Sequence, residues 1–91
     1  MKDLLEIRGQ INNIDDQIIA FWKERMALSL EVAEYKRENN LPILDEKREK
    51  ELLDRISDLA GEELKEYSRE LYSEIMRISR EYQERETKGD L

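Results

Sequence analysis

The feature that most limits the possible folds is a heptad-like apolar repeat in the first 35 residues. Apolar side chains recur at alternating spacings of three and four, at Leu4, Ile7, Ile11, Ile14, Ile18 and Phe21, and again, after a step of seven, at Leu28, Val32 and Tyr35. This spacing predicts one helix from about Asp3 to about Asn39, more than ~50 Å long. Such a helix cannot fold back within a chain of 91 residues, so we expect it to pack along helices of a second copy.

Two shorter helices are predicted to follow. The segment ENNLPILD (38–45) breaks the repeat, and Asp45 stands where an N-cap begins a second helix. We expect this helix over residues 46–59, with Gly61 as its stop. A further apolar stripe predicts a third helix over about 62–84.

The predicted fold is therefore all-α, a single domain over residues 1–91 with a long, a short and a medium helix and a disordered tail at 85–91. The net charge of −7 argues against nucleic acid and anionic membranes as partners. Without a secretory signal or an apolar run of transmembrane length, a cytoplasmic location is expected. The chain has no His and no Cys, so we expect no thiolate chemistry, no metal and no cofactor.

Arg25 occupies a position in the apolar repeat where a hydrophobic side chain is expected. Lys36 lies eleven residues later on the same face, ~16 Å along the axis, so both cations can lean toward one small anion. Each also has a simpler interpretation. Arg25 could pair with a glutamate across the seam and fix its register, and Lys36 could complement the helix dipole.

Arg8 precedes Arg25 by seventeen residues, ~25 Å along a straight helix. If it serves the same anion, it must come from the antiparallel helix of a second chain. The alternative for Arg8 is a surface pair with a nearby carboxylate.

Two further polar pairs share a helix face: Asp45 with Glu49, and Ser79 with Gln83. Helix capping by itself explains Asp45, Glu49 could be an ordinary surface residue, and small polar residues beside an apolar stripe are often incidental. Taken together with the cations, these groups could enclose a small polyanion that carries a hydroxyl group.

The chain resembles the all-helical (type II) chorismate mutase family. The resemblance covers nearly the whole chain and rests on LLEIRGQINNIDDQI (4–18), KERMALSLEVAEYK (23–36), LPILDEKREKELLDRI (41–56) and IMRISREYQ (75–83). It implies an isomerase that rearranges chorismate to prephenate in phenylalanine and tyrosine biosynthesis, by positioning and electrostatic stabilisation without covalent or metal catalysis. It also implies an intertwined, domain-swapped homodimer in which Arg8 is supplied in trans.

The resemblance also assigns roles to individual side chains. Arg25 and Arg8 of the partner would bind the two carboxylates of chorismate, with a hydrogen bond from Ser79. Lys36 and Gln83 would donate to the ether oxygen, and these two residues and Arg25 are the implied catalytic residues. The resemblance also implies that Asp45 and Glu49, or the backbone amide beside them, hold the ring hydroxyl, with Arg48 supporting them. Val32 and Met76 would lie over the ring, with ordinary packing as the alternative for both.

Two other functions fit the same pattern. An isochorismate pyruvate lyase shares the fold and much of the cationic pocket, but it releases pyruvate and salicylate. A non-catalytic helical dimerisation module would instead pair the same cations with the many glutamates.

Overall fold

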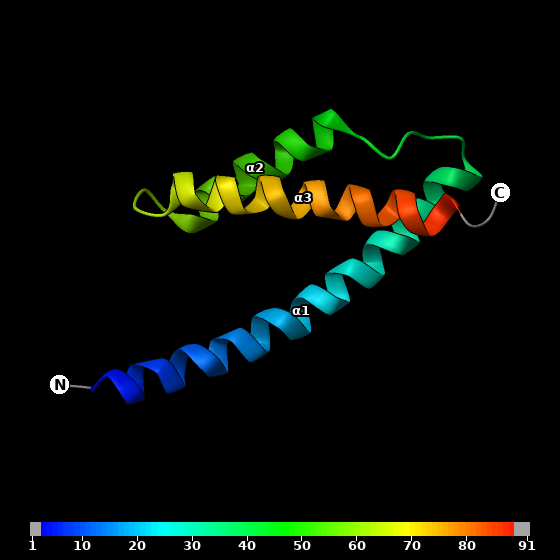
Figure 1. The fold of residues 1–91 in the computed structure, drawn as a ribbon. Helices are drawn as coiled ribbons and strands as arrows, with labels where there is room; N and C mark the ends of the chain where they lie inside the picture. The colour runs from blue at the N-terminus through cyan, green and yellow to red at the C-terminus, as the bar shows by residue number, and fades with distance from the viewer. Residues whose placement is uncertain (1–2, 89–91) are drawn as a thin grey trace.

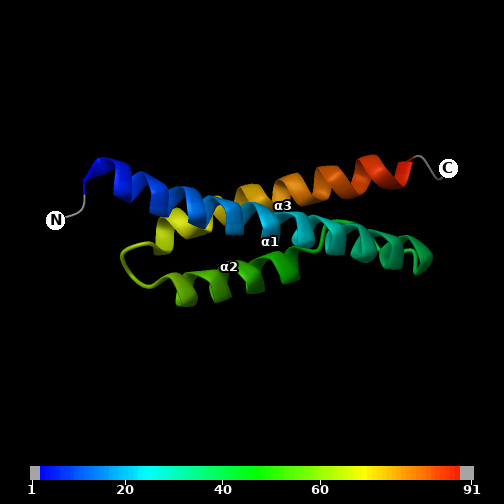
Figure 2. The same ribbon diagram turned by 90° about the horizontal axis from the view of Figure 1, so that it is seen from below.

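The computed structural model describes residues 3–88, which form three α-helices and no strand (Figure 1). The helices are α1 (Leu4–Glu38), α2 (Glu46–Ala60) and α3 (Lys65–Lys88). Their order and relative lengths confirm the predicted all-helical architecture. Helix α3 packs against α2 and against the C-terminal half of α1, as two perpendicular views show (Figures 1 and 2).

Local capping signals set the boundaries of the first two helices. Asp3 caps α1 by accepting a hydrogen bond from the backbone N–H of Glu6 at 2.8 Å. Asp45 caps α2 in the same way through the N–H of Arg48 at 3.0 Å. Gly61 ends α2 with φ of 80°, a conformation that a Cβ atom disfavours. The predicted boundaries of both helices are therefore confirmed to within a residue.

The boundaries of the third helix differ from the prediction. Helix α3 begins at Lys65, three residues late, because residues 62–64 form a turn. It continues to Lys88, four residues beyond the predicted end. Residues 85–88, which the sequence assigned to a disordered tail, are therefore helical, and 89–91 lie outside the described residues.

The apolar core within one chain is small. Its buried apolar side chains are Ala33, Leu52, Ile56 and Met76, with Leu53 and Tyr72 packed against the last three. Leu59, near the C-terminal end of α2, is 69% exposed although it is apolar. A core of this size leaves many apolar side chains of the predicted helical repeats exposed.

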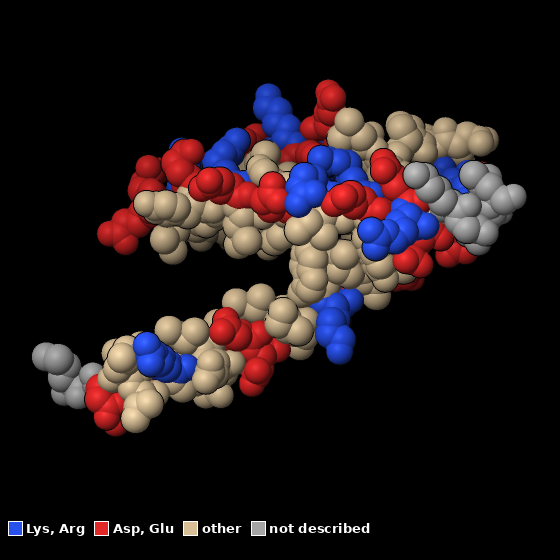
Figure 3. Space-filling model, in the orientation of Figure 1, with Lys and Arg blue, Asp and Glu red and all other residues tan. Residues whose placement is uncertain are grey.

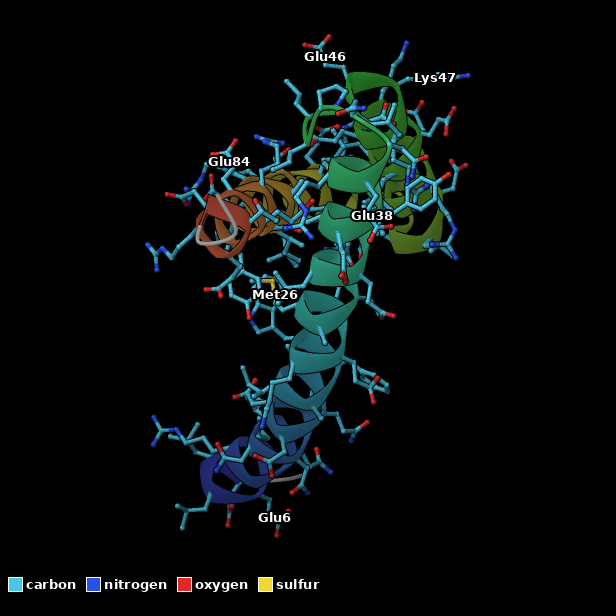
Figure 4. All side chains as sticks on the ribbon, turned by 90° about the vertical axis from the view of Figure 1, so that its right-hand side faces the viewer. Glu6, Met26, Glu38, Glu46, Lys47 and Glu84 are labelled. Atoms are coloured by element: carbon cyan, nitrogen blue, oxygen red, sulfur yellow. The ribbon has the colours of Figure 1, made fainter. Side chains whose placement is uncertain are left out.

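The first half of α1 forms an arm that leaves the rest of the molecule. Every residue from Asp3 to Phe21 is exposed, and Figure 4 shows Glu6 far from α2 and α3. The arm keeps its apolar repeat 41–59% exposed, at Leu4, Ile7, Ile11, Ile14 and Ile18. Largely uncharged surfaces face each other across the gap between the arm and α3 (Figure 3).

The overall dimensions reflect this arm. The principal extents are 57 × 28 × 14 Å and the radius of gyration is 16.6 Å. A compact chain of 91 residues has a radius of gyration of about 12 Å. The single chain is therefore much more extended than a folded monomer of its length.

Candidate active site

A cavity of about 340 Å³ lies between the C-terminal half of α1, the loop that follows it, the start of α2 and the C-terminal half of α3. It is lined by Arg25, Leu28, Ser29, Val32, Lys36, Ile43, Asp45, Arg48, Glu49, Leu52, Met76, Ser79, Arg80 and Gln83. The structure thus brings together nine of the ten side chains that the sequence suggests as substrate contacts. Arg8 is the exception.

The cavity is cationic although the whole chain is acidic. Its ionisable lining consists of four basic side chains, Arg25, Lys36, Arg48 and Arg80, and two acidic ones, Asp45 and Glu49. This leaves two positive charges in excess at a site in a chain whose net charge is −7. A local field of this sign attracts a small dianion.

The two predicted cations of α1 have no carboxylate partner among residues 3–88. Both side chains are half-buried. Lys36 Nζ donates to the backbone carbonyl of Ile43 at 2.7 Å, which holds the ammonium group against the loop before α2. Within the described part of the chain, Arg25 makes neither a side-chain hydrogen bond nor an ion pair. Both positive charges therefore remain available to a bound anion.

Three buried polar side chains form one hydrogen-bonded cluster between α1 and α3. Ser29 Oγ and Ser79 Oγ are 2.8 Å apart, and Gln83 Nε2 donates to Ser79 Oγ at 3.1 Å. Ser29 Oγ also donates to the backbone carbonyl of Arg25 at 3.1 Å. All three polar side chains belong to residues only 6–7% exposed, and Gln83 Oε1 is buried without a partner among the described residues.

Polar contacts hold the side of the cavity that the start of α2 forms. Asp45 Oδ1 accepts the backbone N–H of Arg48, so this carboxylate both caps the helix and lines the cavity. Glu49 forms an ion pair with Arg80 of α3, with the two side chains 25% and 29% exposed. This pair fixes the direction of the Glu49 carboxylate and links α2 to α3 at the cavity.

Arg8 lies on the exposed arm of α1 and is absent from the cavity lining. Seventeen residues separate it from Arg25, which is about 25 Å of helix. Within one chain, the structure therefore does not bring Arg8 to the other predicted site residues.

Sequence reasoning missed five side chains of the cavity: Leu28, Ser29, Ile43, Leu52 and Arg80. A usable signal existed for two of them. Ser29 lies four residues after Arg25 and Arg80 four residues after Met76, so each shares a helix face with a predicted site residue.

Residues 3–88 contain no group of three or more His, Cys, Asp or Glu side chains arranged to bind a metal ion. No helix within the same residues combines the length and the apolarity that a membrane span requires.

Comparisons with known proteins agree with this architecture. Residues 7–84 match the family described as chorismate mutase type II. The chain is 42% identical over 62 residues to a chorismate mutase from Methanocaldococcus jannaschii, covering 68% of this chain and 63% of that protein. It is 47% identical over 57 residues to a bifunctional chorismate mutase/prephenate dehydratase from Buchnera aphidicola, covering 63% of this chain but 15% of that protein.

A solved structure of a conserved hypothetical protein from Pyrococcus furiosus superposes with a TM-score of 0.74 at 35% identity, covering 88% of this chain and 93% of that one. The chain thus has the three-helix fold and the sequence of a type II mutase domain. It belongs to the chorismate mutase type II family.

Proposed function

We propose that this protein catalyses the rearrangement of chorismate to prephenate in the cavity between α1, α2 and α3. The observation that carries the proposal is the pair of half-buried cations, Arg25 and Lys36, that no carboxylate of residues 3–88 neutralises. A partly buried charge without a partner is unfavourable, and a dicarboxylate ligand compensates it. Family membership and the name of the Methanocaldococcus relative support the same activity.

The reaction needs no group that this chain lacks. In the rearrangement, the C–O bond between the ring and the enolpyruvyl group breaks while a C–C bond forms within the same molecule, so no nucleophile and no proton transfer are required. Negative charge grows on the ether oxygen as its bond lengthens. We assign the donation to this oxygen to Lys36 and Gln83, because donors held in place beforehand lower such a barrier by several kcal/mol.

The carboxylates of the substrate require cations on two sides. We assign one carboxylate to Arg25 and the other to Arg8 of the partner subunit. Two guanidinium groups hold a dianion in one orientation, because each can bind a carboxylate with two parallel hydrogen bonds. This grip keeps the enolpyruvyl group over the ring, which is the geometry that the rearrangement needs.

The remaining side chains fit the ring. We assign the hydrogen bond from the ring hydroxyl to Asp45 and Glu49, which line the cavity together with Arg48 of α2. Val32 and Met76 line the same cavity from α1 and α3 and supply apolar contacts to the ring.

The dimer in this proposal is supported by the large accessible surface of the single chain. The single chain exposes 7718 Å², whereas a folded monomer of 11.0 kDa exposes about 5,600 Å². The excess is about 2,100 Å² per chain, and twice this value lies in the range of obligate dimer interfaces. A second copy whose arm packs antiparallel against α1 would cover the exposed repeat, and it would also carry Arg8 toward the cavity of its partner.

The test is depletion of chorismate with formation of prephenate by the purified protein. We expect Arg25→Ala to lower kcat/KM by about 100-fold or more, because it removes a charged contact that a desolvated substrate needs. The melting temperature should remain close to that of the wild type. Arg77→Ala, an exposed arginine that pairs with Glu74 and Glu81 outside the cavity, is the matched control and should leave turnover unchanged.

Two further measurements separate the other functions. Release of salicylate from isochorismate, seen by fluorescence, would identify a lyase. No turnover of either substrate, with no thermal stabilisation by a bicyclic transition-state analogue, would leave a dimerisation module, because a ligand that binds the folded state must stabilise it.

A further inference from the structure

Ser29 is the last side chain in a series of hydrogen bonds that reaches the cavity. The series starts at the Gln83 amide, passes through the hydroxyl groups of Ser79 and Ser29, and ends at the backbone carbonyl of Arg25. The three residues whose side chains form it are 6–7% exposed, so water does not compete freely for these groups. Each hydroxyl or amide proton that forms one of these hydrogen bonds therefore has one defined acceptor.

Counting protons fixes the direction of every bond. Each serine hydroxyl has one proton to donate. Ser29 donates its proton to the carbonyl of Arg25 at 3.1 Å, so the 2.8 Å contact between the hydroxyls must use the proton of Ser79. The proton of Ser79 is then committed, and its oxygen can only accept from the Gln83 amide. This requires the nitrogen of the amide, rather than its oxygen, to face Ser79, as observed.

The buried amide oxygen indicates that the Gln83 side chain has a second possible orientation, in which the amide nitrogen and oxygen exchange places. Gln83 Oε1 is buried and has no partner among residues 3–88, which is an unfavourable state for an acceptor. If the proton of Ser79 were free, turning the amide over would give Oε1 that proton. Ser29 prevents this exchange because it accepts the proton itself.

We propose that Ser29 is a positioning residue that, through Ser79, fixes which end of the Gln83 amide faces the ligand. The consequence for catalysis rests on the proposed function, in which Gln83 donates to the ether oxygen. One N–H of Nε2 is used on Ser79, and the second is the donor left for a ligand. Turning the amide over would move the nitrogen and so displace that donor from the position where charge develops.

The experiment compares Ser29→Ala with Ser57→Ala. Ser57 is a matched control: it is also 7% exposed, its hydroxyl also donates to the carbonyl four residues earlier, Leu53, at 2.8 Å, and it lies outside the cavity lining. The side-chain amide signals are followed by NMR after labelling the three glutamines with ¹⁵N. Gln83→Glu assigns the relevant pair of signals, and thermal melting shows that each variant is folded.

For Ser29→Ala we expect the Gln83 amide protons to shift and to exchange faster with water. We also expect kcat to fall about two- to tenfold, the usual effect of one buried hydrogen bond, with KM changed by less than about twofold. Ser57→Ala should change neither the amide signals nor kcat.

Gln83 amide signals in Ser29→Ala that match those of the wild type would overturn the proposal. Altered signals with an unchanged kcat, in an enzyme that converts chorismate, would overturn the catalytic consequence. If the wild type does not convert chorismate but Ser29→Ala still alters the amide signals, the proposed function fails while Ser29 is supported as the residue that orients Gln83.

Discussion

Arg8 and Arg25 give a sharp test of the proposed dimer, because each site would take Arg25 from one chain and Arg8 from the other. The two residues lie seventeen positions apart on α1, about 25 Å along the helix, so one chain cannot present both to one small molecule. Arg8→Ala and Arg25→Ala therefore damage different halves of the site. A mixture of the two variants should recover activity that neither has by itself.

The expected recovery can be worked out from the geometry. Each variant alone has two defective sites, and loss of one partner of a desolvated charge pair costs about 2–5 kcal/mol, which is about 30-fold or more in binding or rate. In an equal mixture that associates at random, about half of the dimers contain one chain of each kind. Each of these mixed dimers has one complete and one doubly defective site, so the mixture should show about 25% of wild-type turnover.

The assay refolds the two variants together from denaturant at equal concentration and measures chorismate depletion, beside each variant refolded separately. A chain that carries both substitutions, mixed with Arg8→Ala, is the negative control, because no combination of these chains forms a complete site. Tagged chains of different mass show by gel filtration that mixed dimers have formed.

The reasoning is refuted if mixed dimers form but their activity does not exceed that of the separate variants. It is equally refuted if Arg8→Ala converts chorismate at the wild-type rate, since the second carboxylate would then need no arginine from the partner.

Three further outcomes are expected. Ile11→Asp places a charge in the exposed repeat of the arm, so sedimentation should show loss of the dimer and circular dichroism a loss of helix. Arg80→Met removes the ion-pair partner of Glu49, so KM for chorismate should rise about five- to tenfold while the fold is kept. A hydrogen bond and the charge of Arg77 lower the pKa of Glu74. This pair therefore stabilises the fold above the ordinary pKa of glutamate, and its contribution is lost as pH falls through the lowered pKa. The small difference in melting temperature between the wild type and Glu74→Gln at pH 7 should therefore shrink as pH falls below the ordinary pKa of glutamate.

The helix boundaries that could be predicted from sequence depend on local chemistry. Asp3, Asp45 and Gly61 each act within a few residues of their own position, through a side-chain cap or a permitted φ angle. The start of α3 could not be predicted in this way. Residues 62–64 are Glu-Glu-Leu, all good helix formers, yet they form a turn, and no capping residue directly precedes Lys65.

Site residues could be predicted where a charge interrupts an apolar pattern. Arg25 stands out for this reason, and Lys36 shares its face. Ser29 shares a helix face with Arg25, but this signal is weak because a serine in a helix ordinarily bonds to its own backbone, as Ser29 also does. Its second contact, with Ser79, depends on how α1 crosses α3. Arg80 shares a helix face with Met76, but in a chain that is 43% charged this signal is weak, and its contact with Glu49 depends on the register of α2 against α3.

The four apolar side chains that are buried among residues 3–88 of a single chain are too few to hold three helices together unaided. In the proposed dimer, association would supply much of the free energy of folding, and stability would follow the law of mass action. Dilution would then lower the helix content and the catalytic turnover together. The abundance of the polypeptide would set the specific activity of each molecule as well as the number of molecules present.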